Sequence, residues 1–422
     1  MPNYKVVDAV RLDAAMTATA DAIREKTSGT DPIPWNADTG FAEAVAGITG
    51  GGAAVSVPMK DVNFYDYDGT RLYSYTVPEA AALTELPPLP TQPGLICQGW
   101  NWNLADIKAM GREVDVGAMY ITDDGKTRIY ITLTEGRTSP MLGSCPNGTV
   151  TVDWGDGSTP DVLTGTSVTA AKWTPTHEYA APGDYVITLA VDGEMGFYGS
   201  TSTTTGAGSG FLRYSDGTDY RNIAYQSSIK KIEIGGGVTS MGAGTFMNCY
   251  SMTSVSIPNS FTSIGGSAFY NCYSMASVSI PNRVTSFGSM VFQNCYSVKS
   301  ISVPNGVTNF AAFVFYNCYS MARLIIPDNV TGIGNYTFYY CHSITRVIVP
   351  GSVKSIGTFA FYYQYGVRYY DFTRHSAVPT LANTNAFTGI SADCEIRVPA
   401  ALADEWKAAT NWATYADYIV GV

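Results

Sequence analysis

One pattern of apolar and polar positions recurs with a 23-residue period between Phe246 and Phe372, without a slip. Three residue types keep this period. The phenylalanines are Phe246, Phe269, Phe292, Phe315, Phe338 and Phe361; the cysteines are Cys249, Cys272, Cys295, Cys318 and Cys341; the prolines are Pro258, Pro281, Pro304, Pro327 and Pro350. A fixed period in the twenties is typical of a solenoid, in which each unit buries its apolar face only against its neighbours.

Each unit divides into a strand and a second, turn-like half. In the segment SVSIP at 277–281 the apolar residues alternate, which predicts a short strand with Val278 and Ile280 pointing inward. Pro281 ends the strand, because proline has no amide proton for the ladder. In the second half Phe292 and Cys295 are close enough in sequence to favour a turn or a short helical element with both side chains on one face. We expect both to be fully buried against their equivalents in the neighbouring units.

These repeats resemble the BspA-type branch of the leucine-rich-repeat superfamily, in which "IP..VTSIG..AF.NC.SL.SV.IP" recurs. The resemblance covers roughly residues 229–372, with an outlying strand at 395–399, and Met275 or Met321 stands where the family usually has leucine. It implies a curved parallel-β solenoid whose members mostly bind something and rarely catalyse. We therefore expect a chain that is not an enzyme and uses no cofactor.

The pattern along the whole chain predicts a mainly β, multidomain protein. We expect N-terminal helices, an immunoglobulin-like sandwich, and a C-terminal solenoid closed by a helical cap on Leu402, Trp406 and Trp412. In the adaptor region we expect a short helix at 104–110, and packing roles for Trp100 and Trp102. The predicted boundaries are 1–54 for an N-terminal helical attachment segment, 55–125 for a β-rich adaptor, 126–192 for a PKD-like β-sandwich, 193–228 for a linker and entry to the solenoid, 229–372 for the solenoid, and 373–422 for the capping region.

The N-terminal segment predicts a helix with one narrow apolar stripe. The stripe consists of Leu12, Met16, Thr19 and Ile23, at heptad-like intervals. A helical hairpin packed on its own body is one interpretation. An assembly module is the other, because short helices with a narrow seam suit partner helices. The segment also resembles the N-termini of tail and tail-fibre proteins of phages and prophages of gut Firmicutes, which implies other tail proteins as partners.

The stretch VDWGDGS followed by HEYAAPGDY resembles the PKD-type immunoglobulin-like domain. The resemblance implies a core position for Trp154, while Gly155 and Gly157 supply permissive turn dihedrals. Asp153 and Asp156 could pass for a metal pair. They lack the further oxygen ligands that calcium demands at loop spacing, so we interpret them as turn formers that accept hydrogen bonds from nearby amides.

Composition limits the partners. Of 422 residues 45% are hydrophobic and 14% charged, with a net charge of −10 and no basic cluster, which argues against nucleic acid and anionic lipid. Five of the eight cysteines form the repeat series, and we favour buried free thiols over bridging or metal binding. We find no signal peptide, membrane span or lipidation motif and expect no membrane insertion.

Catalytic constellations are missing from the repeats. Asp328 is the only carboxylate from Phe246 to Pro350, whereas glycoside cleavage ordinarily needs two facing each other. His177, His342 and His375 have neither metal-ligand spacing nor a nucleophile motif beside them. No catalytic and no metal-ligating residue is predicted.

A second series follows each cysteine directly and is the candidate ligand-binding surface. If cysteine points inward, its neighbour points outward. The candidates are Tyr250, Tyr273, Tyr296, Tyr319 and His342, together with Tyr362, Tyr363 and Tyr365 in the richest aromatic stretch. One interpretation is a stacked ladder that stabilises the coil; the other is a surface for a glycan or protein, since tyrosine gives contact area at small entropic cost.

The leading hypothesis is a receptor-binding protein of a phage tail, which would assemble in the host cytoplasm, reside in the virion and meet the host surface through its solenoid. We expect a homo-oligomer, with a trimer as one option. The rivals are a bacterial BspA-type cell-surface adhesin and a structural decoration protein of the virion. The missing export signal weighs against the adhesin.

Overall fold

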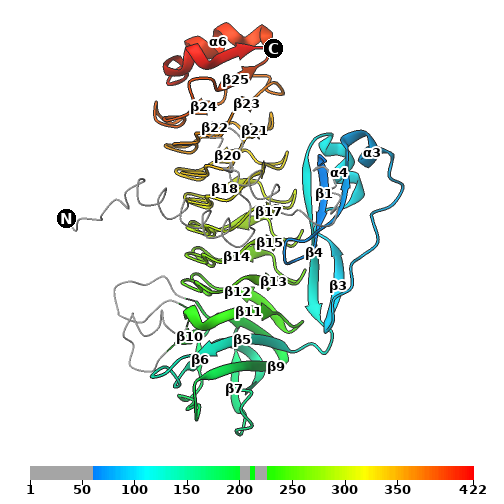
Figure 1. Ribbon diagram of the computed structural model, residues 1–422, viewed down its shortest axis with the longest axis vertical. Helices are drawn as coiled ribbons and strands as arrows, with labels where there is room; N and C mark the ends of the chain where they lie inside the picture. The colour runs from blue at the N-terminus through cyan, green and yellow to red at the C-terminus, as the bar shows by residue number, and fades with distance from the viewer. Residues whose placement is uncertain (1–59, 200–209, 214–225) are drawn as a thin grey trace, which may run out of the picture. The chain divides into compact units, whose positions relative to one another are not determined.

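The computed structural model describes residues 60–199, 210–213 and 226–422 (Figure 1). The described part is mainly β, with a parallel-β solenoid toward the C-terminus and few helices, as the sequence predicted. The predicted helices around Leu12, Met16, Thr19 and Ile23 lie outside the described residues. None of the helices in the described ranges is long and apolar enough to cross a lipid bilayer.

Residues 60–122 form a small module of one sheet and two helices. Its elements are β1 (Val62–Tyr65), β2 (Arg71–Tyr75), α3 (Val77–Ala82), β3 (Leu95–Trp100), α4 (Leu104–Met110) and β4 (Val114–Thr122), with strand order β2-β1-β4-β3. The predicted short helix is confirmed as α4. It begins after Asn103, whose side chain accepts a hydrogen bond from the amide of Asp106, and it ends at Gly111 in the left-handed conformation.

The next segment forms a sheet that continues into the solenoid. Its strands are β5 (Thr127–Leu133), β6 (Met141–Asp153), β7 (Asp161–Thr166), β8 (Lys172–Trp173), β9 (Gly183–Phe197) and β10 (Leu212–Arg213). Strand β5 pairs on one edge with β9 and on the other with β11 (Ile229–Glu233), the first strand of the solenoid. One hydrophobic core therefore runs through both parts, so the expected boundary at 192 is not a break in packing. A PKD-type fold for 126–192 stays a prediction.

The turn around Trp154 is built as the sequence predicted. Trp154 is fully buried, and its indole stacks on the His177 ring at 4.6 Å between centroids. Asp153 accepts a hydrogen bond from the amide of Gly155 at 2.9 Å, and Asp156 accepts one from the amide of Ser158 at 3.0 Å. Both aspartates therefore act as turn formers.

The coils from β11 to β24 each contribute one strand to each of two parallel stacks (Figure 1). One stack holds β11, β13 (Ser254–Ser256), β15 (Ser277–Ser279), β17 (Ser300–Ser302), β19 (Leu324–Ile325), β21 (Arg346–Ile348), β23 (Tyr369–Asp371), β25 (Glu395–Val398) and β26 (Ile419–Gly421). The other holds β12 (Val238–Met241), β14 (Ser263–Ile264), β16 (Ser286–Phe287), β18 (Asn309–Phe310), β20 (Gly332–Ile333), β22 (Ser355–Ile356) and β24 (Thr380–Leu381). Ser277 pairs with Ser300, which is the register that the 23-residue period predicts.

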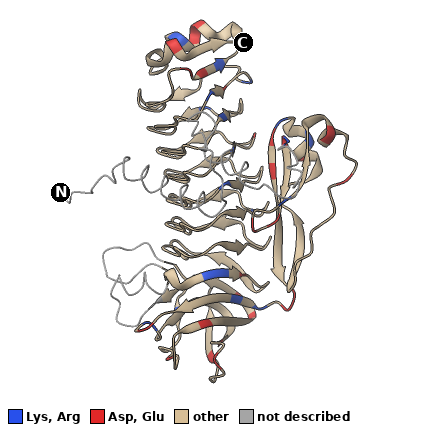
Figure 2. Ribbon diagram, viewed as in Figure 1, with Lys and Arg blue, Asp and Glu red and all other residues tan. Residues whose placement is uncertain are grey.

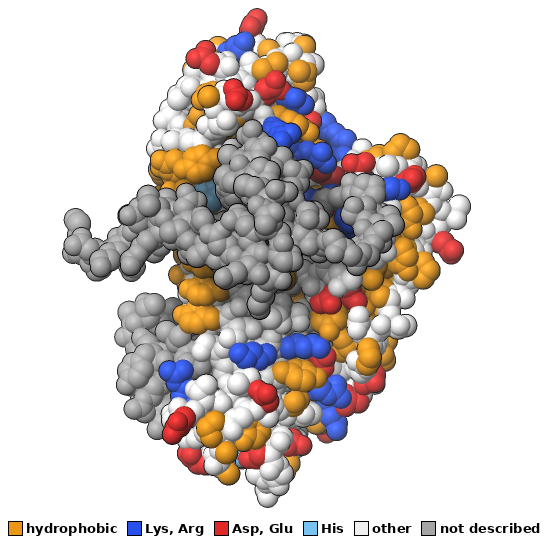
Figure 3. Space-filling model, in the orientation of Figure 1, with side chains coloured by type: hydrophobic (Ala, Val, Ile, Leu, Met, Phe, Trp, Pro, Cys, Tyr) orange, Lys and Arg blue, Asp and Glu red, His pale blue; other side chains and the backbone are white. Residues whose placement is uncertain are grey.

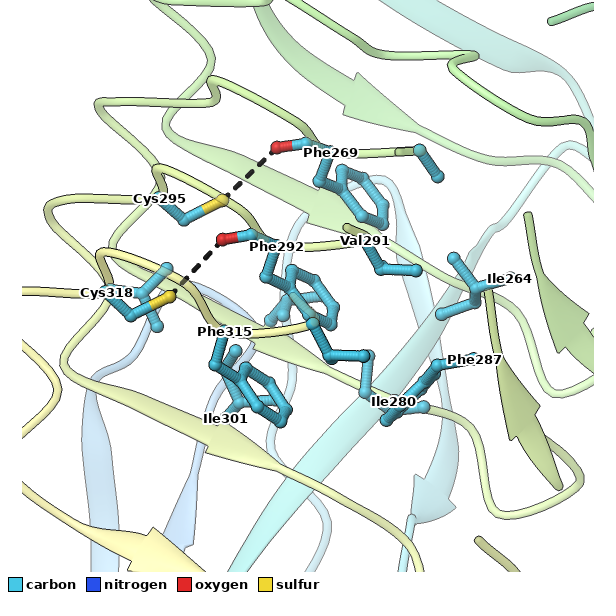
Figure 4. Close-up of a cluster of buried hydrophobic side chains, with 14 of the residues drawn as sticks. Ile264, Phe269, Ile280, Phe287, Val291, Phe292, Cys295, Ile301, Phe315 and Cys318 are labelled. Carbon is cyan, nitrogen blue, oxygen red and sulfur yellow. Dashed lines mark hydrogen bonds between the residues drawn. The ribbon is translucent and has the colours of Figure 1, made fainter. Parts of the chain in front are cut away.

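The interior of the solenoid confirms the predicted stack (Figure 4). Phe292 and Cys295 are fully buried, and the Phe292 ring stacks on Phe269 at 5.5 Å and on Phe315 at 5.7 Å. Val278 and Ile280 point inward as expected. The half of the unit that carries Phe292 and Cys295 consists of turns and not of a helix.

The cysteine series forms a column of buried thiols that donate hydrogen bonds to the backbone. The Cys295 Sγ atom donates to the carbonyl of Phe269 at 3.2 Å, and Cys318 Sγ to that of Phe292 at 3.3 Å (Figure 4). All eight cysteines are free. Burial raises the pKa of the Cys341 thiol to about 12, so this thiol stays protonated at neutral pH and is a poor nucleophile.

The C-terminal cap covers the last coil with short helical pieces. The sequence reads as a single helix here, and this prediction is wrong. The pieces η1 (Ala400–Leu402) and α6 (Ala403–Ala408) end at Ala409, whose backbone is extended. Asn411, at a φ of 66°, then precedes η2 (Trp412–Tyr418). Trp406 and Trp412 nevertheless point inward as predicted and pack on Phe372 at 5.0 and 5.5 Å. The last coil is thereby shielded from water.

The module 60–122 packs on the first strand stack of the solenoid. Asn101 is fully buried; its Nδ2 donates to the carbonyls of Ile280 and Ser302, and its Oδ1 accepts from the Gly117 amide. The backbone comes so close that a Cβ on Gly117 would lie 2.7 Å from the Cβ of Ser279. Trp100 and Trp102 are both buried, which confirms their predicted packing role.

Charged side chains line the same contact. Arg112 donates to the Ile326 carbonyl at 2.6 Å and to the Asp328 carboxylate at 2.9 Å, so the one carboxylate between Phe246 and Pro350 forms an ion pair. Asp115 lies 3.4 Å from the Arg323 guanidinium. Burial raises the pKa of Asp115 to about 6, and the Arg323 charge only partly opposes this effect.

Candidate functional site

The turns after β12, β14, β16, β18, β20 and β22 carry stacked aromatic columns. Figure 1 shows these turns along one edge of the solenoid. The first, here called the tyrosine ladder, comprises Tyr250, Tyr273, Tyr296, Tyr319, His342 and Tyr365. Neighbouring rings lie 4.7 to 5.7 Å apart between centroids, with interplanar angles of 4 to 13°. The structure thus brings six of the eight predicted candidates into one continuous column, with Tyr365 as its last ring.

Further columns stand beside the ladder in the last coils. Tyr316, Tyr339 and Tyr362 stack at 4.6 and 4.8 Å. Tyr363, a predicted candidate, stacks on Tyr340 at 5.3 Å and meets Tyr362 edge to face at 4.2 Å. Together with the end of the ladder these columns form what we call the aromatic patch. Its members are Phe313, Tyr316, Tyr319, Tyr336, Tyr339, Tyr340, His342, Phe359, Tyr362, Tyr363 and Tyr365.

Six members of the patch were not predicted as site residues. They are Phe313, Tyr316, Tyr336, Tyr339, Tyr340 and Phe359. Phe313, Tyr336 and Phe359 stack at 4.7 and 5.0 Å and are themselves spaced by one repeat period. The period would have revealed them, since it aligns the pair Phe313 and Tyr316 with the equivalent pairs of the next two units.

The patch places bulky side chains on a backbone that disfavours them. Each unit has two left-handed positions. One is occupied by Ser267, Met290, Phe313, Tyr336 and Phe359, the other by Asn248, Asn271, Asn294, Asn317, Tyr340 and Tyr363. Asparagine tolerates this conformation, whereas large side chains at positive φ are strained by about 1 to 3 kcal/mol each. Strain of this kind clusters at ligand-binding sites, because selection for function can retain it.

The second left-handed position changes residue type where the patch begins. Asn271, Asn294 and Asn317 each donate from Nδ2 to the Oδ1 of the preceding asparagine, at 2.8 to 2.9 Å. At the next unit Tyr340 takes the place of asparagine, and the Oδ1 of Asn317 is left buried without a hydrogen-bond partner. At this unit the chain therefore loses one hydrogen bond of the asparagine series and has an aromatic ring at the surface instead.

Restoring the asparagine should stabilise the protein. In Tyr340→Asn the new amide can donate to Asn317, and a residue suited to a φ of 58° replaces a strained one. These gains exceed the lost aromatic contacts, so we expect the free energy of unfolding to rise by about 1 kcal/mol. Urea denaturation followed by circular dichroism measures this. Tyr319→Asn, at a position with ordinary φ, is the control and should not stabilise.

The patch carries no formal charge. The turn segments 311–321, 334–344 and 357–367 contain neither Asp, Glu, Lys nor Arg, and Figure 2 shows these turns free of charged positions. Figure 3 shows hydrophobic side chains gathered along the same edge. Burial lowers the pKa of His342 and raises that of Tyr296 to about 12, so both are neutral at physiological pH. The ladder can therefore offer aromatic carbon and uncharged hydrogen-bonding groups.

A concave site beside α4 contains polar side chains but only one carboxylate. A cavity of about 330 Å3 lies between α4 and the turns after the repeat prolines, and is lined by Asn101, Asn103, Asp106, Asn282, Asn305 and Asn329. It holds one carboxylate. Among the described residues no three His, Cys, Asp or Glu side chains are placed to bind a metal ion. Asp106 alone does not provide the pair of carboxylates that glycoside hydrolysis ordinarily uses.

The comparison with protein families identifies the repeats. Residues 220–344 and 308–403 match the model of the BspA type Leucine rich repeat region, in six copies. The solenoid is built from BspA-type leucine-rich repeats. This confirms the predicted repeat class, and proteins with such repeats are typically non-catalytic binding proteins. No curated protein matches the chain.

Solved structures with similar repeats come from several bacteria. The T. pallidum leucine-rich-repeat protein is 31% identical over 26% of this chain and 51% of its own, with a TM-score of 0.26. A leucine-rich-repeat protein of Bacteroides ovatus is 17% identical over 49% of this chain and 67% of its own, with a TM-score of 0.32. The chain thus spans about half the length of the treponemal protein. Leucine-rich repeats are what these proteins have in common with it.

Proposed function

We propose that this protein binds a cell surface without catalysis, and that the aromatic patch and tyrosine ladder are its contact surface. The observation that carries the proposal is the replacement of asparagine by tyrosine at strained positions, Tyr340 and Tyr363, where the exposed columns are widest. A purely structural ladder would gain stability from asparagine there. Aromatic side chains give large contact area at small entropic cost, which suits a binding surface.

We further propose that the protein is the receptor-binding protein of a phage tail, which attaches the virion to its host. Support comes from the N-terminal stripe of Leu12, Met16, Thr19 and Ile23, whose sequence resembles the attachment segments of tail proteins. In this assignment the N-terminus binds other tail proteins, and several copies in a homo-oligomer multiply weak contacts into useful avidity. A BspA-type cell-surface adhesin is the second candidate, since the repeat class suits that role equally well.

The binding role is tested by substituting three rings of the ladder at once. The variant Tyr273→Ser, Tyr296→Ser, Tyr319→Ser should bind host cells at least about tenfold more weakly, since one aromatic contact is worth roughly 1 to 3 kcal/mol. Flow cytometry of cells with labelled full-length protein measures this, and an unchanged far-UV spectrum confirms folding. A control variant, Thr262→Ala with Thr285→Ala, shortens two exposed side chains that directly precede β14 and β16 and lie outside the tyrosine ladder. Equal loss in both variants contradicts a role specific to the ladder.

The tail assignment is tested by deleting residues 1–50. The remaining chain should fold, since residues 59–422 form a compact unit by themselves, but it should no longer enter tails. Immunoblots of purified virions measure incorporation. Truncated protein at the wild-type level in virions would refute the docking role. If instead the full-length protein sits in the particle and binds no host envelope fraction, a decoration role replaces receptor binding.

A further inference from the structure

The aromatic columns stop abruptly at one coil. The turn amides of Phe361 and Tyr363 donate to the carbonyls of Ala386 and Thr388, at 2.9 and 2.8 Å. In the coil before, Phe338 and Tyr340 donate in the same way to Ala360 and Tyr362. The next coil is therefore longer than the regular repeat. Its register aligns Phe359 with Asn385, Tyr362 with Thr388, Tyr363 with Gly389, and Tyr365 with Ser391.

A ring inside a column and a ring at its end offer different surfaces. Inside, both faces are covered by neighbours, as Tyr339 is by Tyr316 and Tyr362 at 4.6 and 4.8 Å, and only the ring edge and hydroxyl reach solvent. At the end, no aromatic ring of the described chain stacks on the C-terminal faces of Tyr362 and Tyr365. Tyr365 is accordingly 56% exposed, compared with 38% for Tyr319 in the same ladder.

The residues of the next coil form a step beside these faces. Gly389 packs directly on Tyr363, since a Cβ there would overlap the ring, so the face of Tyr363 is covered. Thr388 and Ser391 take the register positions of Tyr362 and Tyr365, so no aromatic ring continues the two columns there. The Ser391 hydroxyl accepts a hydrogen bond from the Asp393 amide at 3.4 Å and keeps its own proton to donate. The step thus combines two neutral rings at the ends of their columns with a short hydroxyl side chain.

We propose that this step binds one pyranose ring of a neutral surface glycan, an inference that rests on the proposed function. A pyranose has an apolar face of C–H bonds that packs on an aromatic ring, and hydroxyl groups around its edge that need hydrogen-bond partners. Tyr362 and Tyr365 supply the ring faces, and the Ser391 hydroxyl, which accepts from the Asp393 amide, can still donate to a sugar oxygen. An uncharged glycan fits because residues 357–367 and 382–391 contain no charged side chain.

The ladder and the step then have separate roles. The longer polymer runs along the ring edges and hydroxyls of Tyr273, Tyr296 and Tyr319, while one sugar is held by stacking at the step. A short oligosaccharide occupies the step alone. Its binding depends on the two end rings and is independent of the rings at the far end of the ladder.

The experiment uses full-length protein and neutral hexasaccharides of glucose, mannose, galactose and N-acetylglucosamine, with hexameric polygalacturonate as the anionic comparison. Saturation-transfer NMR identifies the sugar protons in contact, and calorimetry gives the dissociation constant. We expect at least one neutral probe to bind, with the strongest transfer to the protons of one ring face. The variant Tyr362→Ser, Tyr365→Ser should bind it about tenfold more weakly. The control Thr262→Ala, Thr285→Ala changes two exposed side chains outside the ladder and the patch and should bind normally.

Tyr365→Ser alone serves if the double variant does not fold, because the Tyr365 ring is largely exposed. Failure of every neutral probe, binding of the anionic probe only, or equal binding by the two double variants overturns the inference. Cell binding that protease treatment of the cells abolishes also overturns it, in favour of a protein receptor. In each of these cases the proposed function still holds if cell binding depends on the tyrosine ladder. If the wild-type protein does not bind cells at all, both the inference and the proposed function are wrong.

Discussion

Replacing Phe292 by alanine is expected to lower the free energy of unfolding by about 3 to 5 kcal/mol. The ring is fully buried and stacks on Phe269 and Phe315, so its removal leaves a cavity that neither neighbour can fill without leaving its own stack. Burial at this site recurs in every coil, and the effect therefore tests the whole register. Guanidinium denaturation followed by both circular dichroism and tryptophan fluorescence measures it.

The control for Phe292→Ala is Tyr296→Ala, a little later in the same turn. Its ring also stacks on two neighbours, but it lies at the surface and keeps contact with water. We expect it to cost about 1 kcal/mol, as for an aromatic pair without a cavity. A Phe292→Ala protein that unfolds together with this control would contradict the interior stack.

Asn101→Ala is expected to lower the free energy of unfolding by about 2 to 4 kcal/mol. Its amide satisfies the carbonyls of Ile280 and Ser302 and the amide of Gly117, all within a contact that excludes water. Alanine would remove all three hydrogen bonds, and the Ser302 carbonyl would keep only the Ile280 amide, at 3.4 Å. Thermal and urea unfolding measure the loss, and hydrogen exchange should rise most in β4 and β17.

Asn103→Ala is the matched control, because the same side-chain type caps α4 at an exposed site. Losing this cap should cost about 1 kcal/mol. A double-mutant cycle with Ser302→Ala adds a second check, since the Ser302 hydroxyl also contacts the Asn101 amide at 2.9 Å. Additive effects of the two substitutions would show that the module and the solenoid are not coupled through this pair.

The fold of the repeats and their chemistry lead to the same functional conclusion. The coils from Phe246 to Cys341 are each held by a buried phenylalanine, a buried cysteine and paired backbone. The surface columns differ from this interior because they accept strained backbone at Tyr340 and Tyr363. In the proposed function, stability and binding are assigned to different columns of one repeat, which allows the surface rings to vary without loss of the core.

The sequence by itself determined the repeats. Contacts between equivalent positions of neighbouring units recur along the solenoid. The 23-residue repetition in the sequence therefore reveals them directly. The period alone predicts Val278, Phe292 and Cys295 inside and Tyr296 outside. The same period contained the columns of Phe313 and Tyr316, although these were not recognised as part of the site. Trp154 and the turn at Asp153 were also predictable, because their partners lie close by in sequence.

Only the tertiary structure decided how the rest of the described chain meets the solenoid. Asn101 pairs with Ser302 across 201 positions, and β5 pairs with β11 across the whole of β6 to β10. Contacts made once, between segments far apart, leave no period and no local signal in a sequence. The end of the aromatic columns is of the same kind. It follows from the greater length of the last coil, which brings Thr388 and not another aromatic residue opposite Tyr362.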